Sequence, residues 1–195
     1  PDNRAFYSDS NQRFRDFVDF ERNYIPNNNI MLVVHSLEAS PPRKAEAVKW
    51  LDNAAWQIPN TLRVESLASY PIVSQNSLDS VLVQPLLEHY CSVASSCVDA
   101  NEWLTNHPEI VGRLIDTSGN ALAVVLTLDI DLGTTDQIGA ISEQVRQLKS
   151  RFEQHFPDIE ILHTGGIAMM QAFADASNED TAKLLPIAIA GILVV

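Results

Sequence analysis

Cysteine is scarce in this sequence, which has only Cys91 and Cys97 among its 195 residues. Two cysteines are too few for a disulfide-rich scaffold. They lie in the segment CSVASSC, whose intervening residues are mostly small and polar, so a loop can bring the two sulfurs together. Two interpretations stay open: two unpaired, partly buried thiols, or a local disulfide in an oxidising compartment.

The sequence also lacks the short motifs of common catalytic and nucleotide-binding sites. GxxxxGK[ST], GxGxxG, GxSxG and HExxH are all absent. The segment DIDLGTTD has neither the glycine position nor the closing glutamate of an EF-hand calcium loop. Histidines occur singly along the chain, as structural or solvated histidines usually do: His35, His89, His107, His155 and His163. We therefore expect no catalytic residue, no metal site, no cofactor and no enzyme.

Basic residues are few, and 13 Lys and Arg against 25 Asp and Glu give a formal charge of −12 at pH 7. Such a charge repels phosphate backbones, which excludes nucleic acid as an expected partner. The opening residues, PDNRAFYSDSNQRF, lack the apolar region of a signal peptide. Because the sequence starts at Pro1 without an initiator methionine, we expect it to be a segment of a longer protein.

The first half of the chain contains two helical patterns and two strand patterns. Residues 11–25 carry phenylalanines at helical spacing and predict an amphipathic helix with an aromatic stripe. The apolar run over 30–37 predicts a buried strand. Residues 40–58 begin with Ser40 as a candidate N-cap, followed by proline, and predict a helix. Residues 61–70 predict a second strand.

The second half repeats this order after a stretch that predicts short helices. Residues 113–130 predict two strands joined at a Ser-Gly-Asn turn. Apolar residues then step by three and four over 138–152, which predicts the clearest helix of the chain. A last strand over 159–166 ends in Gly165 and Gly166. This glycine pair predicts a tight turn or a hinge, because glycine adopts positive φ freely.

The two halves form a weak internal repeat, in which WQIPNTLRVESL corresponds to QHFPDIEILHTG. Two strand-helix-strand units predict an α+β fold, a ferredoxin-like split βαβ pair of porter type with its helices on one face. The predicted parts are an N-terminal juxtamembrane helix (1–28), a first βαβ half (29–75), a helical insert (76–112), a second βαβ half (113–166), a linker helix (167–183) and an apolar end (184–195).

That apolar end, LLPIAIAGILVV, has no charged side chain. A transmembrane helix needs about 20 apolar residues, so twelve cannot cross a bilayer alone. Three interpretations compete: a buried core element, the start of a truncated transmembrane helix, and an interfacial anchor. An anchor should have a charged face. Pro186 suits a membrane helix better than the interior of a soluble one, so we favour the truncated transmembrane helix.

The order of these parts resembles the first extracytoplasmic loop of resistance-nodulation-division (RND) superfamily exporters. The resemblance covers nearly the whole chain. Within the superfamily, the chain looks most similar to the MmpL-like branch, which exports hydrophobic or amphiphilic molecules. It depends on the order of several moderately specific segments: DNRAFY, VESLASYPIV, NEWLTNHPEIVGRLID, ILHTGG and NEDTAKLLPIAIAGILVV.

The resemblance implies proton-driven export across a bacterial inner membrane, with this domain capturing or passing substrate on the periplasmic side. It implies three kinds of partner: the remaining transmembrane part and second loop domain of the same transporter, a hydrophobic or amphiphilic substrate, and a homo-oligomer as an open option. The proton-relay acids of the family lie outside this segment. A periplasmic location would permit a disulfide between Cys91 and Cys97.

Two other functions remain open. One is a soluble ferredoxin-like ligand-binding or regulatory module, whose apolar tail packs into its own core or into a dimer interface. The other is a translocase accessory loop similar to those of the Sec system. The first alternative predicts that deleting residues 184–195 costs several kcal/mol of stability, because buried apolar area would be lost.

Overall fold

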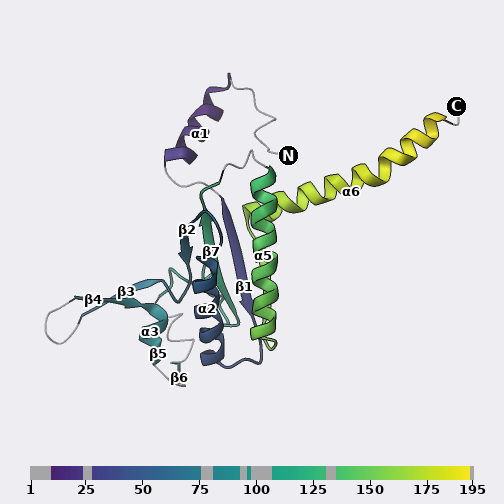
Figure 1. Cartoon of the computed structure of the whole chain (residues 1–195). Coiled ribbons are helices and arrows are strands. Elements are labelled where there is room, and N and C mark those ends of the chain that lie inside the picture. The colour runs from purple at the N-terminus through teal and green to yellow at the C-terminus, as the bar shows by residue number, and fades with distance from the viewer. Residues whose placement is uncertain are drawn as a thin grey trace.

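The chain folds into a mixed α and β structure, which confirms the predicted α+β class (Figure 1). The computed structural model describes residues 10–23, 28–75, 81–92, 96–97, 107–130 and 135–193. Its helices and strands are, in chain order, α1 (Gln12–Asn23), β1 (Asn29–His35), α2 (Pro41–Ala55), β2 (Thr61–Glu65), β3 (Pro71–Gln75), β4 (Val81–Pro85), α3 (Leu86–Tyr90), β5 (Cys91–Ser92), β6 (Ser96–Cys97), β7 (Ala121–Leu128), α5 (Thr135–His155), β8 (Glu160–Thr164) and α6 (Gly166–Leu193).

A four-stranded antiparallel sheet in the order β2-β7-β1-β8 forms the centre of the fold. Strand β1 is paired on both sides, so Leu32 lies opposite Val124 of β7 and opposite His163 of β8. Along β1 the burial alternates, and Ile30, Leu32 and Val34 are the fully buried positions. This alternation indicates that one face of the sheet carries the core.

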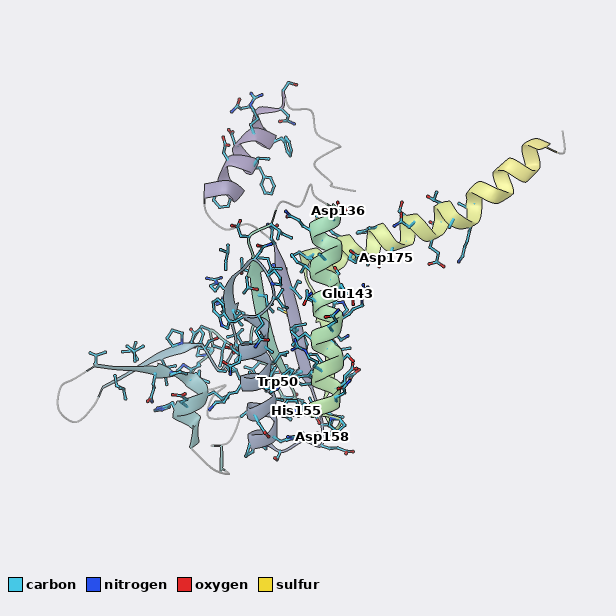
Figure 2. All side chains as sticks on the ribbon, in the orientation of Figure 1. Trp50, Asp136, Glu143, His155, Asp158 and Asp175 are labelled. Carbon is cyan, nitrogen blue, oxygen red and sulfur yellow. The ribbon has the colours of Figure 1, made fainter. Side chains whose placement is uncertain are left out.

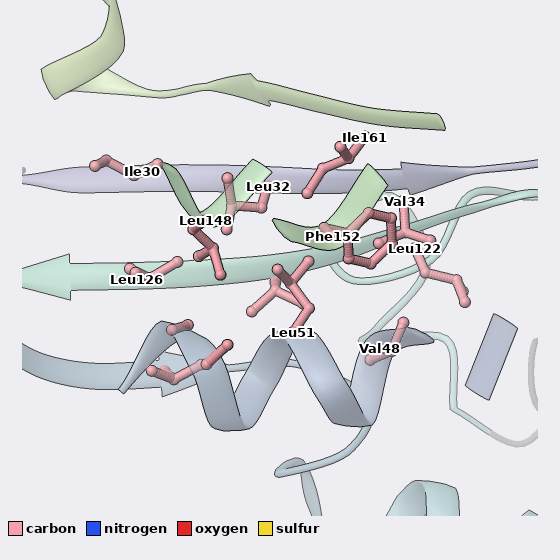
Figure 3. Close-up of a cluster of buried hydrophobic side chains, with 14 of the residues drawn as sticks. Ile30, Leu32, Val34, Val48, Leu51, Leu122, Leu126, Leu148, Phe152 and Ile161 are labelled. Carbon is pink, nitrogen blue, oxygen red and sulfur yellow. The ribbon is translucent and has the colours of Figure 1, made fainter. Parts of the chain in front are cut away.

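Helices α2 and α5 supply the other half of that core (Figure 3). Val48 and Leu51 of α2 and Leu148 and Phe152 of α5 are fully buried against the sheet. The spacing of three and four residues in α5 places its apolar side chains on one side of the helix, as the sequence predicts. The helix at 40–58 is also confirmed, although the Ser40 side chain makes no capping hydrogen bond. Prolines occupy the first turn of α2 instead.

The predicted helix over the start of the insert is wrong for residues 81–85. These residues form β4, which pairs with β3 as an antiparallel hairpin. Their sequence, VLVQP, is rich in β-branched residues, and pairing with β3 is a non-local contact that helical spacing does not reveal. Among the described residues of the predicted insert, only Leu86–Tyr90 is helical, and β5 with β6 forms a second, two-residue pairing. Residues 107–112 form turns, and residues 76–80, 93–95 and 98–106 lie outside the described part of the chain.

The predicted strand before the Ser-Gly-Asn turn is also wrong, because Arg113–Asp116 forms turns. Ile115 makes isolated bridges to Val111 and to Leu122 and is buried. The Asp116 carboxylate closes the turn, since it accepts hydrogen bonds from the backbone N–H groups of Asn120 and Ala121 at 2.8 and 2.9 Å. Burial opposes the charge on Asp116, but these bonds and those from Ser118 outweigh burial and lower its pKa.

Asp116→Asn is expected to lower the free energy of unfolding at pH 7 by about 1.5 kcal/mol, because two backbone donors lose a charged acceptor. A lowered pKa in the folded state means that the stabilisation is present above the ordinary value of 3.8 and is lost as the pH falls through the lowered pKa. Urea denaturation of both proteins across this pH range measures the difference. A penalty that stays constant down to pH 2 would contradict the assignment.

Candidate functional site

The predicted Gly165-Gly166 turn lies where β8 ends and α6 begins, directly beside the start of β1 (Figure 1). Gly165 has φ of +112°, which confirms the positive φ that the glycine pair predicts. A β carbon on Gly165 would lie 2.7 Å from the backbone oxygen of Asn29 and 3.1 Å from the Cα of Ile30. Both the backbone conformation and the close packing therefore require glycine here.

Asn29 fixes the first turn of α6 from a neighbouring strand. The backbone N–H of Gly166 donates a hydrogen bond to Asn29 Oδ1 at 3.0 Å. The N–H of Met169 donates to the backbone oxygen of Gly165, also at 3.0 Å. The first N–H groups of a helix have no acceptor within the helix, so the Asn29 side chain stabilises the start of α6. The turn is thus held from β1, and hinge motion at Gly165 and Gly166 stays a prediction.

Among the side chains of α6 that the structure describes, up to Leu184, those of the first three turns lie against the body. Ile167 is fully buried, and Met170 packs against the core. Beyond these residues the helix leaves the sheet and projects away from it (Figure 1). Phe173 and Leu184 are 59% and 62% exposed. The predicted linker helix over 167–183 and the apolar segment to residue 193 therefore form one continuous helix.

A crevice of about 220 Å³ lies between α5 and the base of α6. Apolar and polar side chains from β1, α5, β8 and α6 line it in equal number. The lining residues are Ile30, Ser142, Val145, Arg146, His163, Ile167, Ala168, Gln171, Ala172 and Asp175. Figure 2 labels Asp175 on α6 and Glu143 on the neighbouring face of α5. The crevice is too small for a large ligand, because drug-sized sites usually exceed about 300 Å³.

Among the residues that line the crevice, His163 has a lowered pKa, which favours its neutral form. Burial lowers its pKa, and the positive charges of Lys149 and Arg146 lower it further. Lys149 Nζ lies 3.3 Å from His163 Nδ1, which fits an ammonium donating to a neutral imidazole. Arg146 is itself paired with Glu143 at 2.5 Å. Because His163 pairs with an ammonium group, the arrangement is not that of a nucleophile and its base.

The second cavity, of about 490 Å³, is a polar groove between α2 and α5. Its lining residues are Ala54, Gln57, Ile58, Gln144, Gln147, Ser150 and Arg151. Amide and guanidinium groups dominate this lining, so the groove does not suit an apolar molecule.

Cys91 and Cys97 lie directly opposite each other in the β5–β6 pairing. Directly opposed residues of an antiparallel pair have Cα atoms about 4.5 to 5.5 Å apart, within the range that a disulfide spans. The register therefore favours a local disulfide, which stays a prediction.

The histidines take separate partners rather than meeting at one centre. His35 lies beside Glu160, and His155 stacks on Trp50 (Figure 2). In the part of the chain that the structure describes, no three His, Cys, Asp or Glu side chains could hold a metal ion.

Sequence reasoning found Gly165 and Gly166 but missed the residues that hold them. Asn29 is separated from Gly166 by 137 positions, and Lys149 from His163 by 14. A glycine pair is visible in the sequence, whereas these contacts depend on strand pairing and helix packing.

No helix within the described residues is long and apolar enough to cross a membrane.

Comparisons with known proteins assign no family to the chain, because no family model and no curated protein sequence matches it. The resemblance to RND exporters therefore stays a hypothesis. It depends on the residues quoted above and on how well the geometry suits such a domain.

Proposed function

We propose that this chain is a periplasmic domain of a proton-driven RND-type exporter of hydrophobic or amphiphilic molecules. In this proposal, the end of the sheet where β1 begins and β8 ends faces the membrane. The observation that carries it is that both flanking helices leave from this end. Helix α1 precedes β1, and α6 follows β8. The hydrogen bond from Gly166 to Asn29 ties the two attachment points together.

We propose further that β1, α2, β2, β7, α5 and β8 form the ferredoxin-like split βαβ pair expected of a porter-type domain. The strand order β2-β7-β1-β8 supports this. Strands β1 and β2 both run antiparallel to β7, which lies between them. Strands β7 and β8 likewise flank β1. In each half, therefore, a helix connects two strands that run in the same direction with one strand of the other half between them.

Helix α6 would connect this domain to the membrane. Its base is bonded to the sheet at Asn29, and its far end carries the uncharged segment LLPIAIAGIL. A helix transmits displacement along its axis where its backbone hydrogen bonds are continuous, and in α6 the first break in that pattern comes at Pro186, which has no N–H to donate. Substrate capture that moves the sheet would then move the apolar end of α6, with no catalytic cluster needed.

Ending the chain after Lys183 is expected to change the free energy of unfolding by less than about 0.5 kcal/mol. Leu184 is 62% exposed, and the helix beyond it projects away from the body (Figure 1). Urea denaturation of the two chains measures the difference. A loss of several kcal/mol would instead favour the soluble module whose tail packs into its own core or a dimer interface.

Labelling of the full-length protein in cells tests the membrane topology. Leu37, 74% exposed just after β1, is a suitable site for a single cysteine in a background where Cys91 and Cys97 are replaced by serine. We expect a membrane-impermeant maleimide to label Leu37→Cys in intact spheroplasts. Labelling only after lysis would place the domain in the cytoplasm and reject the proposal.

A further inference from the structure

We propose that α1 lies on the surface of a lipid bilayer, with its phenylalanine face against the acyl chains. The inference rests on the proposed function in one respect, namely that the β1/β8 end of the sheet faces a membrane. It goes further because it names a partner for α1, a helix that lies apart from the sheet (Figure 1).

The first argument is the exposure of the aromatic face of α1. Phe17 and Phe20 are 53% and 57% exposed, although both are large apolar side chains. Phe14 precedes them by one further step of three residues, and Val18 follows Phe14 by four, so the four side chains form one stripe along the helix. Large exposed apolar groups gathered in one stripe are typical of a surface that contacts another apolar phase.

The second argument is the position of α1 relative to α6. Five residues separate the end of α1 at Asn23 from the start of β1 at Asn29. The six Cα-to-Cα steps from Asn23 to Asn29 span at most about 22 Å. The C-terminal end of α1 therefore stays within that distance of Asn29, whose side chain holds the first turn of α6. A membrane that receives the apolar end of α6 lies on the side of the sheet from which α1 also leaves.

The third argument is charge. Within α1 the three arginines, Arg13, Arg15 and Arg22, balance Asp16, Asp19 and Glu21. The whole formal charge of −12 therefore lies outside α1. Anionic head groups repel the acidic remainder of the chain but not this helix.

A second copy of the chain is a poorer occupant for this face. Helix α1 has 12 residues and is therefore about 18 Å long. A stable protein–protein interface buries about 800 Å² on each partner, which is several times the area of one face of such a helix. Contact with a bilayer needs less area on α1 itself, because the apolar end of α6 would bind the same bilayer.

Hydrogen–deuterium exchange of the full 195-residue chain tests this inference, because it reports on α1 and α6 separately. The probe is vesicles of equal parts dioleoylphosphatidylcholine and dioleoylphosphatidylglycerol. We expect amide exchange over residues 10–23 to slow about tenfold when vesicles are added. Exchange over the apolar end of α6 is expected to slow as well, whereas the β1 amides should not change.

The double variant Phe17→Ser and Phe20→Ser should lose the protection of α1 while α6 keeps its own. Leu37→Ser is the control, because it removes an apolar side chain that is even more exposed, at 74%, just beyond the opposite end of β1. This control should retain the protection of α1. Circular dichroism melting of the variants checks that folding is unchanged, as expected for exposed positions.

Three results would overturn the inference. In the first, vesicles protect α6 but not α1, which rejects the membrane contact of α1 and leaves the proposed function intact. In the second, vesicles protect neither helix, which also removes the support for a membrane-facing end. In the third, α1 becomes protected without vesicles as the protein concentration rises, which identifies a second copy of the chain as the partner.

Discussion

Gly165→Ala is expected to lower the free energy of unfolding by about 3 kcal/mol. At φ of +112° a side chain strains the backbone, and the added β carbon would lie 2.7 Å from the backbone oxygen of Asn29. That oxygen belongs to Asn29, which pairs with Thr127 of β7, so it cannot move without disturbing the sheet. Urea denaturation followed by circular dichroism measures the loss.

Gly139→Ala is the matched control for this prediction. Gly139 lies inside α5, and a β carbon there would meet nothing within 4 Å. Alanine is preferred over glycine in a helix interior by about 0.5 to 1 kcal/mol, so this variant should be more stable than the parent protein. If both variants changed stability by the same amount, the close packing of Gly165 against β1 would be wrong.

Phe152→Ala is expected to cost about 4 kcal/mol, because it removes a fully buried ring from the centre of the core. Phe152 lies between α2 and the sheet, with its ring centroid 5.9 Å from that of Trp50 and 5.0 Å from that of Phe156 (Figure 3). Trp50 belongs to α2, whereas Phe156 follows the end of α5, so a local shift of one segment cannot close the cavity. Urea denaturation again measures the effect.

Phe17→Ala makes the same chemical change on the exposed face of α1. Without membranes it is expected to change stability by less than about 0.5 kcal/mol, since Phe17 is 53% exposed. A large loss at Phe17 would mean that α1 packs against the sheet in solution. That result would also remove the exposed stripe on which its proposed membrane contact depends.

The parts of the fold that could be predicted are those whose signals are local. In α5, steps of three and four residues over 138–152 give one apolar side regardless of what packs on it. Strand β1 is an apolar run of β-branched and long residues bounded by polar turns. Gly165 was visible for a similar reason, because a glycine pair after a strand is itself a turn signal.

The parts that could not be predicted depend on partners far away in the sequence. The segment VLVQP was expected to be helical, and its pairing with Pro71–Gln75 decides that it is a strand. Ile115 forms isolated bridges rather than a strand, and next to it the Asp116 carboxylate closes the chain onto Ala121. No local pattern in the sequence singles out Asn29, whereas the sheet places its side chain at the first turn of α6.

Transport by the full-length protein in proteoliposomes tests the central claim most directly. With a fluorescent amphiphile as cargo, we predict that a proton gradient drives its movement across the bilayer and that a protonophore stops it. Gly165→Ala should slow this movement, because the connection between the sheet and α6 would be displaced. Movement at the same rate with and without the gradient would contradict the assignment of this domain to a proton-driven exporter.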